Sequence, residues 1–413
     1  MLRIFPTLLR TRLRPRAGRS GFVPGYLCGL LILLALAGAP RAQTTPAGNA
    51  AEPEPVPPGA GQADRTEPVI DVYTMGPGDD LFSRFGHAAI CVTDAKSPLG
   101  RCYNYGTADF STPGPLTWSF LRGRAQFWVS VVPQPHMIAV YAREDRTLWR
   151  QRLPLPPETA RRLAQRLHAA DVREATFYLY HHFNDNCTTR IRDLIDEATD
   201  GALRQGAMVP SDPPLRRYVH AGFAGQPLLL ILTDLLLGRP SDRPTTRWQG
   251  MFLPELLRRE LESRFAAPPV VMYARQRPLP IGSSLGGAWI LVPAGLLLLA
   301  AVHLARRRPG LAKGLVGIGL GFFGLLVSGL AACAALPELR QNEALLICLP
   351  TDLLLLFLPV RWAAAYARLR LVGLLAGAVA VTAGLLIQPL WPLLLFCALP
   401  LVGISRLRVG VKS

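Results

Sequence analysis

Hydrophobic residues are unevenly distributed along this 413-residue chain. One apolar run covers residues 22–39, and five more follow the middle region, at 285–304, 311–336, 344–360, 371–388 and 389–404. A helix of about 20 apolar residues spans a bilayer. The first two of the five late runs reach that length, whereas the third and the last are shorter and fit tilted or re-entrant segments. The pattern predicts an all-α transmembrane bundle of about five helices at 285–405.

The region before this bundle has the patterning of a soluble domain, predicted at 69–275. Runs rich in β-branched and aromatic residues predict strands at 69–75, 87–93, 100–105, 127–132, 137–142 and 147–153. Residues 157–170 show helical spacing, with Leu163 and Leu167 on one face. Several strands bracketed by helices indicate an α+β domain. Residues 43–68 are rich in Pro, Ala, Gly, Thr and Glu and are predicted to be a disordered linker.

The net charge of +17 argues for membrane flanks rather than nucleic acid. Basic residues cluster beside the apolar runs, at 1–20, 306–313, 361–370 and 406–412. Positive loops stay on the cytoplasmic side of a membrane. With residues 1–20 inside, one crossing places 69–275 outside, and a basic tail at 406–413 ends inside. Residues 1–42 are therefore a basic n-region followed by a signal peptide or an uncleaved anchor helix.

Cysteine use directs attention to one thiol. Of seven cysteines, four lie in apolar runs, and Cys91 and Cys102 flank a short loop. These two fit a disulfide across a hairpin in an oxidising compartment, and they fit two free thiols equally well. Cys187 is left without a partner in the soluble region.

Cys187 follows good N-cap and turn residues at 184–186 and opens a stretch with helical spacing. The positive end of a helix dipole favours the nucleophilic thiolate. His87, after Gly86 and at the start of a predicted strand, is the preferred base. The helix-start amides are expected to face a developing oxyanion. Asn104 is the best-placed residue to orient the imidazole, and Asp109 is the alternative.

At these positions the chain resembles a known family. The blocks Arg84–His87, Tyr103–Phe110 and Asn186–Asp193 resemble the Lnb N-terminal periplasmic domain family, and the later spans, including Asn342–Pro350, resemble the Lnb-like transmembrane domain. The resemblance implies a permuted papain/NlpC-like fold in the periplasm of a multi-pass inner-membrane protein. It further implies a membrane-anchored thiol acyltransferase similar to lipoprotein N-acyltransferase, and it carries the catalytic cysteine and histidine onto Cys187 and His87.

Other polar residues near the thiol suggest substrate contacts. Arg190 and Arg192 follow Cys187 on its helix and either bind a phospholipid head group or pair with neighbouring aspartates. His182 is a candidate lining or acceptor-site residue. The patch Trp248–Pro254 and the helix after it either lie on the bilayer surface or pack on the soluble domain. No metal-ligand spacing and no cofactor motif is evident.

The expected function is transfer of an acyl chain from a membrane phospholipid, through a Cys187 thioester, to an amine such as a lipoprotein N-terminus. A cell-wall amidase or peptidase is the second hypothesis, because papain-like folds commonly cleave peptides. A non-catalytic envelope binding protein is the third, and full complementation by a variant lacking both Cys187 and His87 would favour it.

Overall fold

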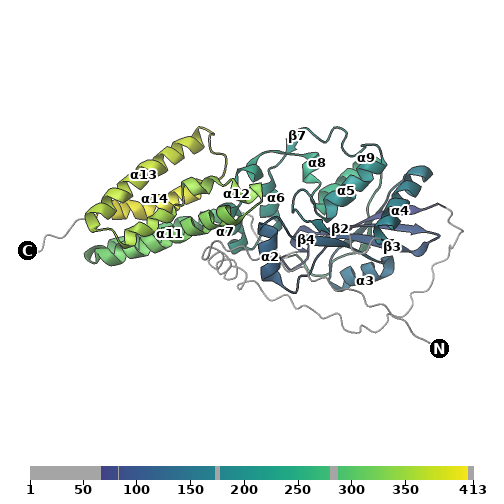
Figure 1. Cartoon of the computed structure of the whole chain (residues 1–413), viewed down its shortest axis with the longest axis horizontal. Coiled ribbons are helices and arrows are strands. Elements are labelled where there is room, and N and C mark those ends of the chain that lie inside the picture. The colour runs from purple at the N-terminus through teal and green to yellow at the C-terminus, as the bar shows by residue number, and fades with distance from the viewer. Residues whose placement is uncertain (1–66, 82, 173–176, 280–286, 408–413) are drawn as a thin grey trace, which may run out of the picture.

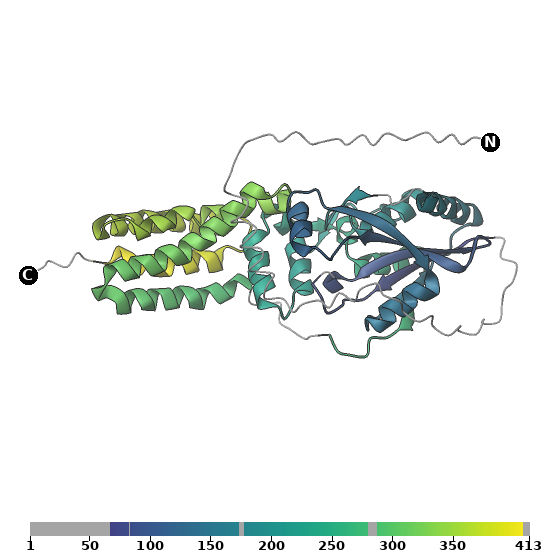
Figure 2. The ribbon, with the colours of Figure 1, turned by 60° about the horizontal axis from the view of Figure 1, so that its bottom comes forward.

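The computed structural model describes residues 67–81, 83–172, 177–279 and 287–407. A mixed α/β head, which contains the sheet, sits at one end of a helical bundle (Figures 1 and 2). The predicted n-region and apolar run at 1–42, the linker up to residue 66 and the end of the basic tail from residue 408 lie outside the described residues.

The head is built on a seven-stranded sheet in which neighbouring strands run antiparallel, in the order β6-β4-β3-β2-β1-β5-β9. Its strands are β1 (Val69–Met75), β2 (His87–Asp94), β3 (Ser97–Thr107), β4 (Gln126–Pro133), β5 (Leu148–Arg152), β6 (Tyr178–Leu179) and β9 (Val270–Tyr273). A second, two-stranded sheet pairs β7 (Pro210–Asp212) with β8 (Thr245–Thr246). An antiparallel sheet combined with helices agrees with the predicted α+β domain, whereas the permuted papain/NlpC-like arrangement stays a prediction.

Both faces of the sheet are covered, which explains why its central strands are almost continuously apolar. Ile70, Ile90 and Tyr103 belong to the larger core, on the face that carries α4 (Pro157–Val172), α5 (Cys187–Ala198) and α9 (Pro254–Phe265). The alternate residues Met75 and Cys91 pack on the other face against Met137 of α3 (Gln134–Arg143). Successive strand side chains point to opposite faces, so each strand serves both cores.

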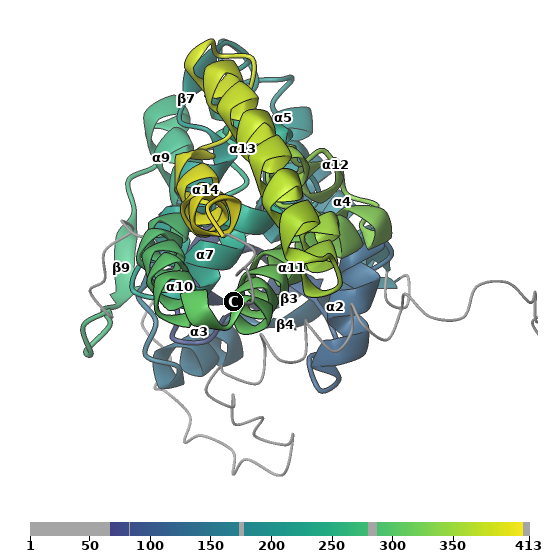
Figure 3. The same ribbon diagram turned by 90° about the vertical axis from the view of Figure 1, so that its left-hand side faces the viewer.

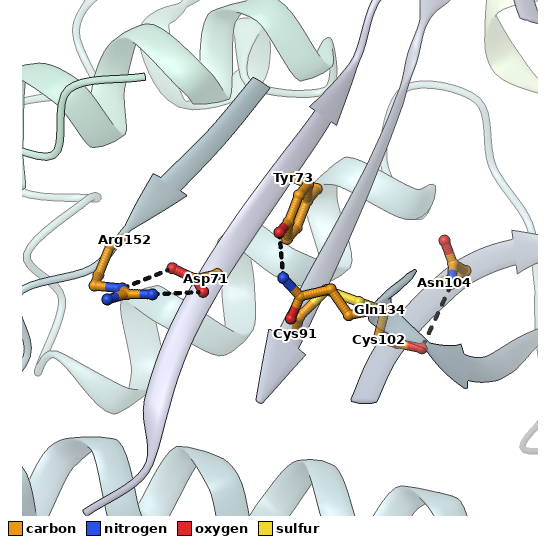
Figure 4. Close-up of a disulfide and its surroundings, with 7 residues drawn as sticks. All are labelled: Asp71, Tyr73, Cys91, Cys102, Asn104, Gln134 and Arg152. Atoms are coloured by element: carbon orange, nitrogen blue, oxygen red, sulfur yellow. Dashed lines mark hydrogen bonds and ion pairs between the residues drawn. A yellow bond between two sulfur atoms is a disulfide. The ribbon is translucent and has the colours of Figure 1, made fainter. Parts of the chain in front are cut away.

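Cys91 and Cys102 form a disulfide across β2 and β3 (Figure 4). The two residues are directly opposite in the ladder and almost fully buried. The pairing left open by the sequence is therefore made, as expected for a domain in an oxidising compartment.

One predicted strand is wrong. Residues 137–142 lie in helix α3, which has Pro135 in its first turn and buries Met137 against the sheet. Ile138 and Tyr141 pack on the same cluster as Met137, at the spacing of one helix face. The short apolar run resembles a strand because a helix face and a buried strand look alike over six residues.

The remaining helices of the head lie between the sheet and the bundle or against the larger core. They are α2 (Pro113–Leu121), α6 (Leu215–Gly222), α7 (Pro227–Leu236) and α8 (Arg247–Gly250). The patch around Trp248 is interior: Trp248, Met251 and Phe252 are buried, and α9 buries Leu257 and Leu261 in the larger core. The bilayer-surface interpretation of this patch is therefore wrong, and the alternative of packing on the soluble domain is confirmed.

The bundle contains α10 (Leu291–Leu304), α11 (Pro309–Cys333), α13 (Val360–Thr382) and α14 (Trp391–Ser405), seen end-on in Figure 3. Three helices in the described part of the chain are long and apolar enough to cross a membrane, at Gly287–Arg307, Pro309–Cys333 and Val360–Thr382. The apolar helix α14 is shorter, at 15 residues. A membrane domain of five crossings stays a prediction.

The predicted third and fourth spans differ in form from the structure. Residues 343–346 and 350–356 are 3₁₀ turns packed along α11 rather than an α-helix. Helix α13 starts at Val360, so the basic stretch 361–370 lies on it and not in a loop. Arg370 on this helix is buried and donates two hydrogen bonds to the Asp352 carboxylate. The helix can include this arginine because its charge is paired.

The head is fastened to the bundle by hydrogen bonds at their junction. The amides of Gly238 and Arg239, which follow α7, donate to the carbonyls of Glu338 and Gln341, at the short helix α12 (Pro337–Arg340). Arg239 also forms an ion pair with Glu343. The head therefore has a defined position relative to the apolar helices.

Candidate active site

Helix α5 starts at Cys187 because Asn186 caps it. The Asn186 Oδ1 atom accepts hydrogen bonds from the amides of Thr188 and Thr189, both at 2.9 Å, and the Thr189 hydroxyl accepts from the Asn186 amide at 2.8 Å. This reciprocal capping box fixes the first turn. The cap also uses the amides of Thr188 and Thr189, which were expected to face an oxyanion. The Cys187 amide is not part of the cap.

His87 is the first residue of β2, and Gly86 sets its position. Gly86 has φ +81°, and a Cβ there would lie 2.7 Å from the Met75 carbonyl oxygen, so only glycine lets β2 begin beside the end of β1. The imidazole stacks on Tyr141 of α3, with ring centroids 6.0 Å apart. The base predicted from sequence is thus held between a strand start and a helix.

The structure brings Cys187 and His87 together, although they are far apart in sequence. Burial raises the pKa of the half-buried Cys187 thiol. The His87 charge and a hydrogen bond with the His87 ring lower this pKa. Hydrogen bonds from the Ala88 backbone and the Thr188 side chain act in the same direction. The balance brings the pKa of Cys187 from 9.0 to about 7. A thiol of this pKa is about half ionised at pH 7, far more than an ordinary cysteine, and is reactive.

This pKa predicts a pH dependence. We expect the rate of Cys187 alkylation by iodoacetamide to rise about tenfold per pH unit below 7 and to level off above about 8, because only the thiolate reacts. Cys333, Cys348 and Cys397, which form no disulfide in the described part of the chain, serve as internal controls in a peptide-resolved mass-spectrometric assay. A Cys187 profile that keeps rising to pH 9 would show an unperturbed thiol.

Tyrosines surround the thiol, and sequence reasoning did not identify them. Burial, reinforced by the negative charge of the Cys187 thiolate, raises the pKa of Tyr178 and Tyr180. Burial also raises the pKa of Tyr141, with a smaller contribution from that charge. The three hydroxyls therefore stay protonated and are able to donate hydrogen bonds. Tyr141 was missed because its helix was read as a strand; helical spacing with Met137 was the available signal.

A second glycine makes room beside the thiol. A Cβ on Gly106 would lie 3.4 Å from the Cys187 Cβ and 3.8 Å from the Tyr178 hydroxyl, and Gly106 has φ +88°. The left-handed backbone is accessible to glycine at little cost. The start of α5 can therefore approach the end of β3 closely.

Asn104 and Asp109, the two candidates for orienting His87, are placed differently. Asn104 lies on the same sheet face as His87, next to the disulfide, and is buried (Figure 4). Its Oδ1 has no hydrogen-bond partner in the described residues, and its amide makes one long contact, 3.5 Å, with the Cys102 carbonyl. Asp109 is exposed and accepts hydrogen bonds from Ser111. The geometry favours Asn104, whose role stays a prediction.

The two arginines after Cys187 both have protein partners. Arg190 forms two hydrogen bonds with Asp185, at 2.6 and 2.9 Å, and its guanidinium lies 3.7 Å from the Tyr178 ring centre. Arg192 is buried, donates to the Trp248 carbonyl and pairs with Asp193. These contacts favour the alternative in which the two arginines pair with neighbouring aspartates over the one in which they bind a phospholipid head group.

The two adjacent histidines have different surroundings. His182 contacts the aromatic rings of Phe85, Phe183 and Phe252. Burial, with a smaller contribution from His181, lowers its pKa to about 4, so it is neutral. No described contact tests its predicted substrate role. His181 lies 3.6 Å from the Glu338 carboxylate of α12. This contact joins the turn before Cys187 to the bundle.

In the described ranges, no group of three His, Cys, Asp or Glu side chains is arranged to hold a metal ion. The residues that converge are a thiol, an imidazole and phenol hydroxyls. This set is suited to nucleophilic acyl chemistry.

Residues 61–219 match the family model of the Lnb N-terminal periplasmic domain, a range that includes His87, Asn104 and Cys187. Neither the curated proteins nor the solved structures gave a match. With the three apolar helices, the match indicates a membrane protein that carries a periplasmic domain. Residues 61–219 are therefore similar to the Lnb N-terminal periplasmic domain.

Proposed function

We propose that the protein is a periplasmic thiol acyltransferase anchored in the inner membrane. The observation that carries the proposal is the pairing of Cys187 with His87, which brings the thiol pKa to about 7 in a head fastened to apolar helices. The donor is a membrane phospholipid, and the acceptor is an amine such as the N-terminus of a lipoprotein. A permuted papain-like arrangement, with histidine before cysteine, fits this chemistry.

In the first half-reaction the Cys187 thiolate attacks the carbonyl carbon of a phospholipid ester. The oxyanion that forms accepts hydrogen bonds from the Cys187 amide and from a tyrosine hydroxyl. The carbon–oxygen bond then breaks, and the protonated His87 ring donates its proton to the lysophospholipid alkoxide. A thioester on Cys187 and a neutral imidazole remain.

In the second half-reaction an amine attacks the thioester carbonyl. Neutral His87 accepts the proton that the amine loses, and the carbon–sulfur bond breaks to release the amide product. Cys187 leaves as the thiolate beside imidazolium, which restores the starting pair. No redox step and no cofactor is needed for this sequence.

The same thiol and base would also serve an amidase or peptidase. That alternative requires only the head, whereas a lipid donor explains why the head is held against apolar helices through residues 238–239 and 338–343. A purely binding protein needs no thiol of lowered pKa. The lipid reaction therefore accounts for more of the described features.

The proposal is tested by mass spectrometry of the full-length protein incubated with phospholipid vesicles. We expect an acyl adduct on the peptide containing Cys187 that hydroxylamine removes, and no adduct in a Cys187→Ala variant. Cys333→Ala is the matched control, since Cys333 also forms no disulfide and is half-buried. An enzyme that forms no adduct but releases peptides from peptidoglycan would support the amidase instead.

A further inference from the structure

Helix α2 (Pro113–Leu121) has no charged residue and is apolar on both of its faces. Its inner face packs Leu116 and Phe120 against the larger core. Its outer face presents Pro115 and Trp118, with 38% of Trp118 exposed. A surface helix of a soluble domain normally turns charged or polar residues outward. An uncharged outer face indicates that something other than water covers it.

The structure shows what lies beside this helix. The Leu121 carbonyl accepts a hydrogen bond from the Ala335 amide at 2.8 Å, and Arg122 donates to the Cys333 carbonyl at 2.9 Å. A Cβ on Gly123 would lie 3.5 Å from that of Ala335. Cys333 is the last residue of α11, a helix long enough to span a membrane. The end of α2 is therefore tied to the point where α11 ends.

Figures 1 and 2 place α2 at the end of the head that faces the bundle. If α11 crosses the bilayer, α2 lies at the depth of the periplasmic head groups. Tryptophan is enriched at that depth, where an amphipathic ring is favoured. Arg122 and Arg124, which follow α2, are exposed and carry the charge that lipid phosphates attract.

Aromatic rings connect α2 with the reactive thiol. Phe120 of α2 lies 6.2 Å from the Tyr180 ring centre, and Tyr180 stacks on Phe127 at 4.1 Å. Tyr180 and Cys187 both pack against the larger core, together with Phe120. Packed apolar side chains thus run from the inner face of α2 to the core against which Cys187 packs.

We infer that α2 is the helix by which the head contacts the phospholipid bilayer, and that it guides a phospholipid's acyl ester toward Cys187. The occupant of its outer face is the bilayer surface, not a protein partner. The guiding step rests on the proposed acyl transfer, whereas the lipid contact does not. Trp118 and its neighbours thus act as a membrane-binding surface.

The contact is tested by photo-crosslinking of the full-length protein in nanodiscs that contain radiolabelled phospholipid. Benzoylphenylalanine replaces Trp118 in one sample and Leu99 in the control. Leu99 is a suitable control because it is also exposed, at 70%, but lies near the start of β3, whereas α2 follows the other end of this strand. We expect labelled lipid on the protein with the probe at 118 and none with the probe at 99. Crosslinks to protein alone, or none, would overturn the inference.

Function is tested with Trp118→Glu and the control Leu99→Glu. For each we compare the rate of Cys187 acylation by vesicle phospholipid with the rate by a water-soluble short-chain ester. We expect the ratio of these rates to fall about tenfold in Trp118→Glu only, because a carboxylate opposes insertion at the head-group level. An unchanged ratio would contradict the guiding role.

Failure of the lipid contact can be distinguished from failure of the proposed acyl transfer. Lipid crosslinks at position 118 without any acyl adduct on Cys187 would leave the membrane contact and reject the acyltransferase. An acyl adduct on Cys187 without lipid crosslinks at position 118 would support the acyltransferase and reject the membrane contact of α2. The crosslinking arm is also performed in Cys187→Ala protein, where acylation cannot contribute label.

Discussion

Replacement of His87 by alanine is expected to lower the rate of Cys187 acylation by about 10³-fold, since a positioned general base contributes about 10² to 10⁴. His87 is also the main source of the lowered thiol pKa. Without its charge and hydrogen bond, burial dominates and the pKa of Cys187 rises. The thiolate fraction at pH 7 then falls, and the loss is partly reversed at higher pH.

Two measurements check this expectation. The first is the pH profile of Cys187 alkylation, which should shift to higher pH in His87→Ala. The second is rescue of acylation by added imidazole, which can occupy the space left by the ring. His136→Ala is the control, because His136 lies exposed on the same helix as Tyr141 and is not part of the site. An unshifted alkylation profile would show that His87 does not set the thiol's ionisation.

The second large effect is expected for Asn186→Ala. Asn186 is buried and makes four side-chain hydrogen bonds: it accepts from two amides of α5 and donates to the carbonyls of His182, at 2.7 Å, and Phe252, at 3.0 Å. Loss of an N-cap costs about 1 kcal/mol, and each buried carbonyl left unpaired adds about 1 kcal/mol or more. We expect a loss of about 3 kcal/mol in the free energy of unfolding.

This loss corresponds to a fall of about 6 to 12 °C in the midpoint at which the head unfolds in the purified full-length protein. Asn184→Ala is the matched control, since Asn184 is exposed and its hydrogen bonds reach only His181. Asn186→Asp keeps an oxygen that accepts from both amides, but its second oxygen would face the His182 and Phe252 carbonyl oxygens, so its midpoint should also fall. Equal midpoints for Asn184→Ala and Asn186→Ala would reject this role of the cap.

Residues that act through local sequence were predictable. The N-cap and the helix that starts at Cys187 follow from Asn184–Asn186 and from the apolar spacing after them. The strands β1, β2, β4 and β5 follow from runs bounded by glycine, proline or polar residues. Such features depend on neighbours within a few positions, and the chain displays those neighbours directly.

The surroundings of the thiol were not predictable in the same way. Tyr141 stacks on His87 only because α3 crosses the face of the sheet that carries the disulfide. Arg192 looks exposed by sequence but is buried under Trp248, because α8 and α9 pack over α5. Contacts of this kind are set by the packing of distant elements, which no local pattern records.

The sequence by itself indicated Cys187 and His87 as candidate thiol and base and predicted the soluble domain and the apolar runs, because each of these predictions rests on residue type and short-range spacing. Only the tertiary structure decided that His87 lies against Cys187 and lowers its pKa, that Cys91 pairs with Cys102, and that α2 rather than α9 lies beside the end of α11. Two segments equally apolar in sequence can end in the core or at a membrane-facing surface. Which of these happens depends on the elements that cover them, and that is fixed by long-range packing.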